Sequence, residues 1–210
     1  MANVFIDEDI LIGIGNAIRA KTFKTDLIFP RDMSVEISNI TSNDNVELLN
    51  AIINRTVTDI VIDTDIGSYA FFDCGKINPI FGDGCGRIGA YAFQNCGGII
   101  EINTNKVTII SSNSFIGLNK LIKADLPNVI ELNNGAFANC KNIMSLILRV
   151  NTICNLKSTG AFLNTPIEKK TGYIYVPKAL LEQYKVATNW TLYAAQFRAI
   201  EDYQEIAGGI

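Results

Sequence analysis

Residues 88–96 read Ile-Gly-Ala-Tyr-Ala-Phe-Gln-Asn-Cys, and this pattern returns along the chain at a fixed interval. It consists of an aliphatic residue, three small or polar residues, Ala-Phe or a close variant, two spacers, and then cysteine or an aliphatic residue. Copies occupy residues 66–74, 88–96, 110–118 and 132–140, so the spacing is 22 residues three times in succession. A degenerate fifth copy contains Gly160-Ala161-Phe162, with its phenylalanine 25 residues after that of the fourth. A fixed period in the twenties indicates a solenoid, in which each unit packs on its neighbours.

Each repeat should contribute a short strand, a turn, and the Ala-Phe segment on the opposite side. The strand candidates are residues 60–62, 77–80, 99–102, 121–126 and 143–148. Stacked on one another, they are expected to form one parallel sheet along one face of an α/β repeat. The run Gly82–Gly86 interrupts the first unit, and we interpret it as a turn with glycine at positive φ. A phosphate-binding loop would need a Lys-Ser/Thr pair that this run lacks.

The equivalent positions of the repeats define the predicted core. No repeat can bury its apolar side alone, so stability should come from the stacking of neighbours. The predicted core columns are Phe71, Phe93, Phe115, Phe137 and Phe162, together with Cys74, Cys96 and Cys140. Leu118 occupies the cysteine position in another repeat, which favours inert thiols that act as small hydrophobic groups. A Cys74–Cys96 disulfide and a catalytic cysteine are the alternatives.

The composition disfavours several classes of function. The chain has 210 residues, a net charge of −3 and no basic patch, which argues against nucleic-acid binding. It contains no histidine, which removes the commonest general base and most zinc sites, and its cysteine spacing resembles no zinc motif. We therefore expect no enzyme activity, metal or cofactor. The sequence shows no apolar run of 18 residues and no signal peptide, so we expect no membrane insertion and synthesis in the cytoplasm.

The repeats are flanked by two different terminal regions. The expected regions are an N-terminal helical assembly module (1–42), an entry linker (43–56), the repeats (57–176), and a C-terminal helical cap with a tail (177–210). Helices are expected over 7–22 and 31–40, where apolar residues recur at helical spacing. Residues 173–176 should form the last strand. A helix should begin at Pro177, and a second helical segment should follow Ala187.

The sheet face is the expected binding surface. The side chains expected to point outward between the core columns are Glu101, Asn103, Lys123, Asp125, Ser145 and Arg149. Such faces commonly bind partners in repeat proteins, although mixed charge without clustering is also typical of plain solvated surface. Four aromatic residues, Tyr69, Tyr91, Trp190 and Tyr193, could stack on sugars or pack beside the phenylalanine column and in the cap.

The repeat, with Ala-Phe-x-x-Cys at its centre, resembles the BspA-type leucine-rich repeat over residues 57–176. The run Tyr175-Val176-Pro177 through Ala187-Thr188-Asn189-Trp190 is similar to the helical cap that closes such arrays. The resemblance implies a leucine-rich-repeat-like solenoid. BspA-type repeats occur in bacterial and protist surface proteins and in phage structural proteins.

A second resemblance lies in the first 40 residues. The run Ile14–Thr22, followed by Asp26–Pro30, Asp32-Met33 and Glu36-Ile37, resembles an N-terminal module of tail-associated proteins in phages of Gram-positive hosts, with Phe23 in place of the usual glycine. This resemblance implies a bacteriophage virion structural protein, tail- or baseplate-associated, that is made in the host cytoplasm and released by lysis. Its expected partners are other virion proteins, a host-surface glycan or protein, and further copies of itself. The alternative is a bacterial cell-surface adhesin or a glycan-binding accessory module.

Overall fold

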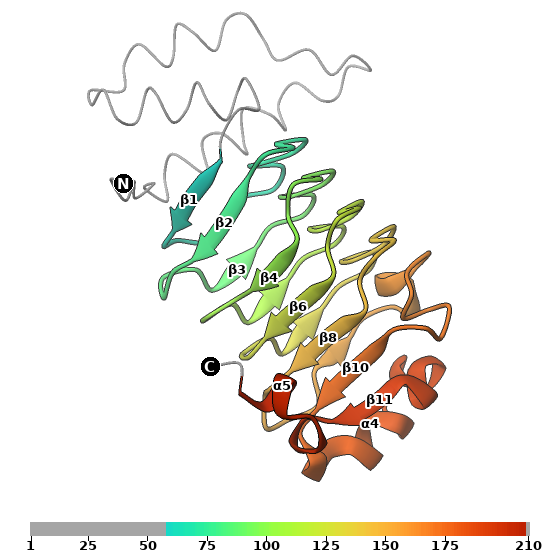
Figure 1. Cartoon of the computed structure of the whole chain (residues 1–210). Coiled ribbons are helices and arrows are strands. Elements are labelled where there is room, and N and C mark those ends of the chain that lie inside the picture. Colours follow the sequence, from blue (N-terminus) through green and yellow to red (C-terminus); the bar gives the residue numbers. More distant parts are fainter. Residues whose placement is uncertain (1–57, 209–210) are drawn as a thin grey trace, which may run out of the picture.

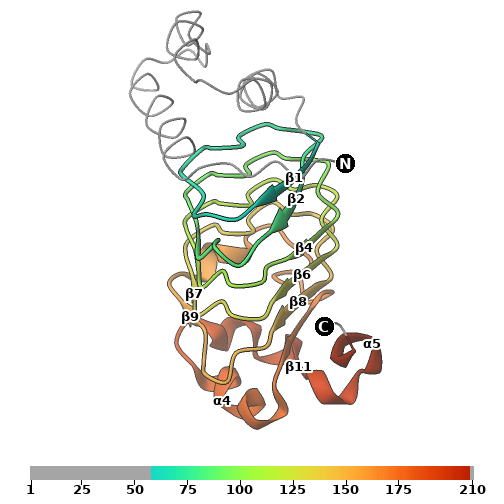
Figure 2. The ribbon, with the colours of Figure 1, turned by 90° about the vertical axis from the view of Figure 1, so that its left-hand side faces the viewer.

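The computed structural model describes residues 58–208, so the expected N-terminal module (1–42), the entry linker (43–56) and residues 209–210 lie outside the described residues. The described chain is a stack of similar turns that descends from β1 to the C-terminal segment (Figure 1). In the side view, the strands β4, β6 and β8 lie on one side of the stack and β7 and β9 lie on the other (Figure 2). Each turn therefore crosses the stack between two ladders of parallel strands.

The strands form three parallel sheets instead of the single sheet expected from the sequence. The five-stranded sheet consists of β4 (Glu101–Asn103), β6 (Lys123–Leu126), β8 (Ser145–Leu148), β10 (Tyr173–Val176) and β11 (Phe197–Ala199). The two-stranded sheet pairs β1 (Asp59–Ile62) with β2 (Asn78–Phe81). The four-stranded ladder on the other side consists of β3 (Arg87–Ile88), β5 (Ile109–Ile110), β7 (Glu131–Leu132) and β9 (Asn155–Leu156). This four-stranded ladder forms because the chain of each repeat is also extended just before its Ala-Phe segment.

The two-stranded sheet and the five-stranded sheet are separated by a break in pairing between β2 and β4. The N–H groups of Asn78 and Gly82 donate to β1 and its flanking residue, so the backbone of residue 79 faces the side of β4. Residue 79 is proline, which has no N–H to donate to a ladder. In addition, the buried strand residue is four positions after Ile77 in β2, at Phe81, but three positions after Ile99 in β4, at Ile102. The missing donor and the shifted register together explain why β2 does not pair with β4.

The Ala-Phe segments turn tightly because two positions in each repeat adopt the left-handed conformation. The first position is held by Tyr69, Tyr91, Asn113 and Gly135, and the second by Asp73, Asn95, Gly117, Asn139 and Asn164. Glycine and asparagine adopt this conformation most readily. The glycines of Gly82–Gly86, expected at positive φ, do not adopt it. Gly84 is needed for another reason, because a Cβ there would collide with the carbonyl oxygen of Asp63.

The phenylalanine and cysteine columns fill the interior. The rings of Phe71, Phe93, Phe115, Phe137 and Phe162 stack in order, with successive centroids 5.2, 5.4, 5.4 and 6.0 Å apart. All five rings are fully buried. Burying a phenylalanine contributes about 1.5–3 kcal/mol, and offset aromatic pairs add about 0.5–1.5 kcal/mol. The stack therefore ties each turn to the next along the length of the described chain.

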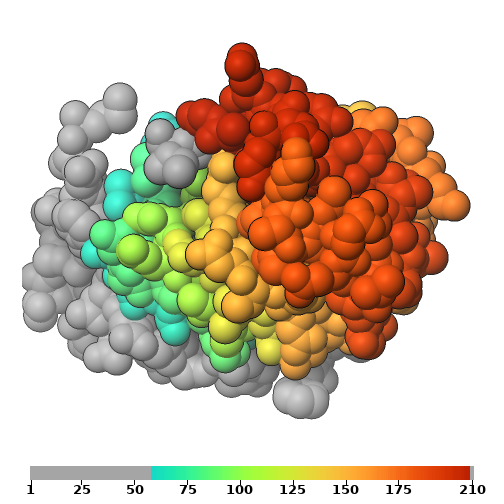
Figure 3. Space-filling model, turned by 90° about the horizontal axis from the view of Figure 1, so that it is seen from below, coloured from blue at the N-terminus to red at the C-terminus, as the bar shows by residue number. Residues whose placement is uncertain are grey.

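The C-terminal segment covers the last turn, and Figure 3 shows it, in orange to red, over this end of the stack. It follows β10 and consists of η2 (Lys178–Leu180), α4 (Leu181–Val186), η3 (Trp190–Gln196), β11, η4 (Ile200–Asp202) and α5 (Gln204–Ala207), whereas η1 (Thr159–Phe162) is the fifth Ala-Phe segment of the stack. The expectation that residues 173–176 form the last strand is wrong, because β11 follows and pairs with β10. Trp190 and Tyr193 pack against Phe162 and so end the phenylalanine stack.

Candidate functional site

The outer face of the five-stranded sheet carries two rows of aligned side chains, and the second row consists of Asn103, Asp125, Ile147 and Tyr175. Glu101, Lys123, Ser145 and Tyr173 are partners in register and form the first row. Lys123 Nζ lies 2.9 Å from Glu101 Oε2, and both side chains are well exposed. Exposed ion pairs contribute only about 0–1 kcal/mol. This pair therefore cancels charge on the surface more than it stabilises the fold.

Asp125 and Arg149 were predicted as outward binding residues, but the structure gives them an internal role. The Arg149 guanidinium donates to both carboxylate oxygens of Asp125, at 2.9 and 2.7 Å, and to the carbonyl oxygen of Ile206 at 2.7 Å. Only 13% of the Arg149 side chain and 7% of the Asp125 side chain are exposed. Bidentate arginine–carboxylate pairing of this kind is strong and directional. It fastens the C-terminal segment to the sheet.

The C-terminal segment covers part of the outer face. Ile147 and Tyr175, which point outward from β8 and β10, are buried in a small apolar cluster with Ile200 and Ile206. The ring of Tyr203 packs edge-on against Tyr175 at 5.3 Å. The outer face is therefore closed over the Ile147 and Tyr175 positions of β8 and β10, while Tyr173 stays exposed. It is open from β6 towards β2.

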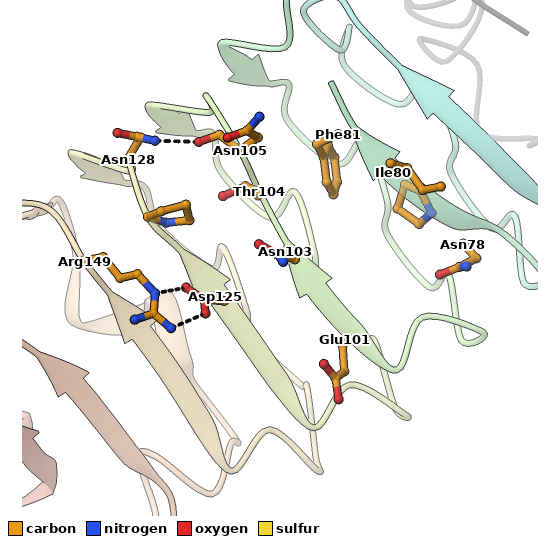
Figure 4. Close-up of a pocket in the computed structure, with 12 residues that line it drawn as sticks. Asn78, Ile80, Phe81, Glu101, Asn103, Thr104, Asn105, Asp125, Asn128 and Arg149 are labelled. Atoms are coloured by element: carbon orange, nitrogen blue, oxygen red, sulfur yellow. Dashed lines mark hydrogen bonds and ion pairs between the residues drawn. The ribbon is translucent and has the colours of Figure 1, made fainter. Parts of the chain in front are cut away.

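A hollow of about 610 Å³ lies on this open part, at the interruption between β2 and β4 (Figure 4). Its lining residues are Asn78, Pro79, Ile80, Phe81, Glu101, Asn103, Thr104, Asn105, Asp125, Pro127, Asn128 and Arg149. Four of the predicted face residues (Glu101, Asn103, Asp125 and Arg149) thus belong to the hollow, while Lys123 and Ser145 stand on the sheet beside it. Figure 4 shows Phe81 and Ile80 on one wall and Asn103 and Thr104 on the facing wall.

Most polar groups around the hollow already have partners. Asn78 donates to Asp59 at 2.9 Å, Asn105 donates to Asp83, and Asn128 donates to the carbonyl oxygen of Asn105 at 2.6 Å. The side-chain amide of Asn103 is exposed and has no hydrogen-bond partner within residues 58–208. The hydroxyl of Thr104 is buried and is likewise unpartnered among the described residues. The hollow thus offers a neutral amide for binding.

All five cysteines are buried free thiols, and Cys74 and Cys96 do not form a disulfide. Cys96 Sγ donates to the carbonyl oxygen of Phe71 at 2.9 Å, and Cys140 Sγ donates to that of Phe115 at 3.0 Å. Burial raises the pKa of the Cys140 thiol to about 12 and also raises the pKa of Cys96. A thiol with a raised pKa is a poor nucleophile near neutral pH. The arrangement gives these groups a packing role.

The aromatic residues considered for sugar stacking fall into two groups. Trp190 and Tyr193 are fully buried in the C-terminal segment, so they cannot stack on a ligand. Tyr69 and Tyr91 are half-buried and stack on one another, with centroids 4.8 Å apart. They are in the Ala-Phe turns and do not line the hollow.

Sequence reasoning missed Asn78, Phe81, Thr104, Asn105 and Asn128 as parts of one site. The signal in the sequence was Pro79 inside a predicted strand, because proline is confined to edge strands. Residues 58–208 contain no group of three or more His, Cys, Asp or Glu side chains suited to a metal ion. Within the same residues, no helix has the length and apolar character needed to cross a membrane.

Comparison with known proteins gives the family. The family model described as the BspA type leucine rich repeat region matches residues 64–178 in six copies. A solved leucine-rich repeat protein from Bacteroides ovatus is similar over 59% of this chain and 40% of its own length, at 22% identity and a TM-score of 0.41. The chain therefore spans less than half of that protein. A search of curated proteins finds no match. The family model covers more than half of the sequence, and this chain belongs to the BspA-type leucine-rich repeat family.

Proposed function

We propose that this chain is a binding module that presents the open outer face of its sheet to another macromolecule and catalyses no reaction. The observation that carries this proposal is the hollow of about 610 Å³ at the interruption between β2 and β4. Ligand pockets commonly measure about 300–1,000 Å³. The interior of the described stack is filled by apolar side chains, so recognition takes place on its surface.

The residues around the hollow support binding instead of catalysis. Asp125 is held in its ion pair with Arg149, and Glu101 is paired with Lys123. General acid-base catalysis needs a titratable group whose pKa and position suit proton transfer. These two carboxylates are instead held in ion pairs with Arg149 and Lys123. Burial raises the pKa of four thiols in the core, those of Cys85, Cys96, Cys140 and Cys154.

We further propose that the module works in a bacteriophage virion, associated with the tail or baseplate, where it would contact another virion protein or the host surface. This proposal rests on the resemblance of residues 14–37 to phage tail-associated proteins, and these residues lie outside the described ones. An N-terminal module would then supply assembly, including self-association, while the repeats supply the contact. A bacterial surface adhesin or glycan-binding accessory module is the second candidate, and the amide-rich lining of the hollow favours its glycan-binding form.

Two measurements test these proposals. Gold-labelled antibody should mark the tail or baseplate on particles induced from the source organism, whereas label on the cell envelope beside bare particles would overturn the virion location. The contact face is tested with labelled full-length protein added to host cells and to particles. Lys123→Glu should weaken association, because it reverses a charge on the sheet face. Lys157→Glu is the matched control, since Lys157 pairs with Glu131 on the other ladder at 3.2 Å. A loss of association with the control alone would refute the assigned face.

A further inference from the structure

We propose that the hollow between β2 and β4 binds one or two sugar residues of a neutral glycan. The inference deepens the proposed binding function by naming a ligand class for the hollow. It depends on that function only in assuming that the outer face is the contact surface. The argument uses the charge, the hydrogen-bonding groups and the apolar walls of the hollow.

Charge in the hollow is cancelled within the protein. Arg149 is neutralised by Asp125 at 2.7 Å, and Glu101 is neutralised by Lys123 at 2.9 Å. A charged ligand would lose its hydration without gaining an unpaired counter-charge, which is unfavourable. The hollow therefore favours a neutral ligand.

The polar lining is made of groups that both donate and accept hydrogen bonds. Asn78, Asn103, Asn105 and Asn128 bring four side-chain amides to one hollow, and each amide has a carbonyl acceptor and an NH₂ donor. The NH₂ groups of all but Asn103 already make one hydrogen bond each within the protein. The Asn103 amide is exposed and unpartnered among the described residues. Sugar hydroxyl groups also donate and accept, so they suit such a lining. Asn103 is the last residue of β4, and Figure 4 shows it on the wall that faces Phe81 and Ile80.

The apolar part of the lining matches the C–H faces of a sugar ring. Pro79 of β2 and Pro127, which directly follows β6, contribute pyrrolidine rings to the lining, and Ile80 is 54% exposed. The ring of Phe81 is held in place edge-on against Phe93 at 5.8 Å. Apolar walls with a few convergent polar groups are typical of small-ligand sites.

An extended peptide fits the site less well. Peptides that bind by strand addition need a free sheet edge along which the backbone can pair. The edge of β4 has only three residues and faces β2, whose Pro79 offers no N–H. The same proline that opens the hollow thus removes a donor that a pairing strand would use.

The test uses the full-length chain on an array of neutral, anionic and cationic oligosaccharides of defined sequence. Selective binding to neutral members is expected, and the best of them is then titrated by calorimetry. Asn103→Ala should weaken the affinity about tenfold, the effect of one lost hydrogen bond. Asn142→Ala is the matched control and should leave the affinity unchanged, because Asn142 lies on a turn outside the hollow and donates to Asn119.

The remaining outcomes separate this inference from the proposed function. Failure to bind any neutral oligosaccharide, or binding that Asn103→Ala leaves unchanged, overturns the glycan inference. If labelled protein still associates with cells or particles through Lys123 in that case, the binding function stands and the glycan inference alone fails. Selective capture of an extended peptide in the hollow, lost in Asn103→Ala, would also overturn it.

Discussion

The hydroxyl oxygen of Tyr184 accepts a hydrogen bond from the backbone N–H of Cys154 at 2.9 Å. Cys154 leads into β9, which is the last strand of the four-stranded ladder within residues 58–208. Trp190 Nε1 donates to the carbonyl oxygen of Cys154, and Asn189 Nδ2 donates to that of Leu156, both at 2.7 Å. Side chains of the C-terminal segment thus take the place of the next strand and satisfy the buried backbone groups.

Removing the Tyr184 hydroxyl should therefore destabilise the protein with little change in shape. Tyr184→Phe keeps the ring but leaves a buried N–H unsatisfied, which should lower the free energy of unfolding by about 1–3 kcal/mol. Urea denaturation measures the difference. Tyr173→Phe serves as the control, because 37% of Tyr173 is exposed and water can replace its hydroxyl contacts. Equal stability of Tyr184→Phe and wild type would contradict the role given to the hydroxyl.

Truncating a ring in the middle of the phenylalanine stack should lower the free energy of unfolding more than Tyr184→Phe does. Phe93 has a ring neighbour on each side, Phe71 at 5.2 Å and Phe115 at 5.4 Å, and it is fully buried. Phe93→Ala should leave a cavity between two stacked turns and lower the free energy of unfolding by about 3–5 kcal/mol. Thermal and urea unfolding measure this loss. Phe72→Ala is a suitable control because Phe72 is only half-buried, and a comparable loss in both variants would refute the special position of Phe93.

The sequence predicted the parts of the fold that repeat and missed those that depend on single departures from the repeat. The phenylalanine column follows from the 22-residue period, because equivalent residues of stacked turns must meet. The break beside β2 was missed because the interval from Ile77 to Ile99 is still 22 residues, although the buried strand residue shifts to Phe81. Arg149 was placed on an open face because its backbone partner, Ile206, is 57 residues away. Periodicity cannot show a contact with a non-repeating segment.

The buried thiols should make stability fall at alkaline pH. An unfolded cysteine ionises at a pKa of about 8.5, whereas burial raises the pKa of Cys140 and Cys85 in the native protein to about 12. Below both values the thiol is protonated in both states and the native protein keeps its full stability. As pH rises from about 9 towards 12, only the unfolded chain loses the proton, so unfolding becomes more favourable.

Urea denaturation at pH 7 and at pH 10 measures this effect. Cys140→Leu should show a smaller loss between the two pH values, because it removes one titrating thiol and Leu118 fills the equivalent position of the preceding repeat. Wild type and variant with the same pH dependence would show that Cys140 does not contribute to it.

A substitution at Thr104 should stabilise the protein, whereas the changes at Tyr184 and Phe93 should destabilise it. It occupies a column of buried residues in which Leu126, Leu148 and Val176 are its counterparts in the following strands. Its hydroxyl is buried without a hydrogen-bond partner among the described residues, and such a group lowers stability by about 1–3 kcal/mol relative to an apolar group of the same shape. Thr104→Val should therefore raise the free energy of unfolding in urea by about 1 kcal/mol or more.

The same substitution at Thr108 provides the comparison. Thr108 Oγ1 donates to the carbonyl oxygen of Gly86 at 3.1 Å, so Thr108→Val removes a made hydrogen bond and should lower the free energy of unfolding by about 0.5–1.5 kcal/mol. The two variants should move the urea midpoint in opposite directions. If Thr104→Val is instead destabilised as much as Thr108→Val, the Thr104 hydroxyl has a partner in solution, and ordered water below the hollow is then the group to look for.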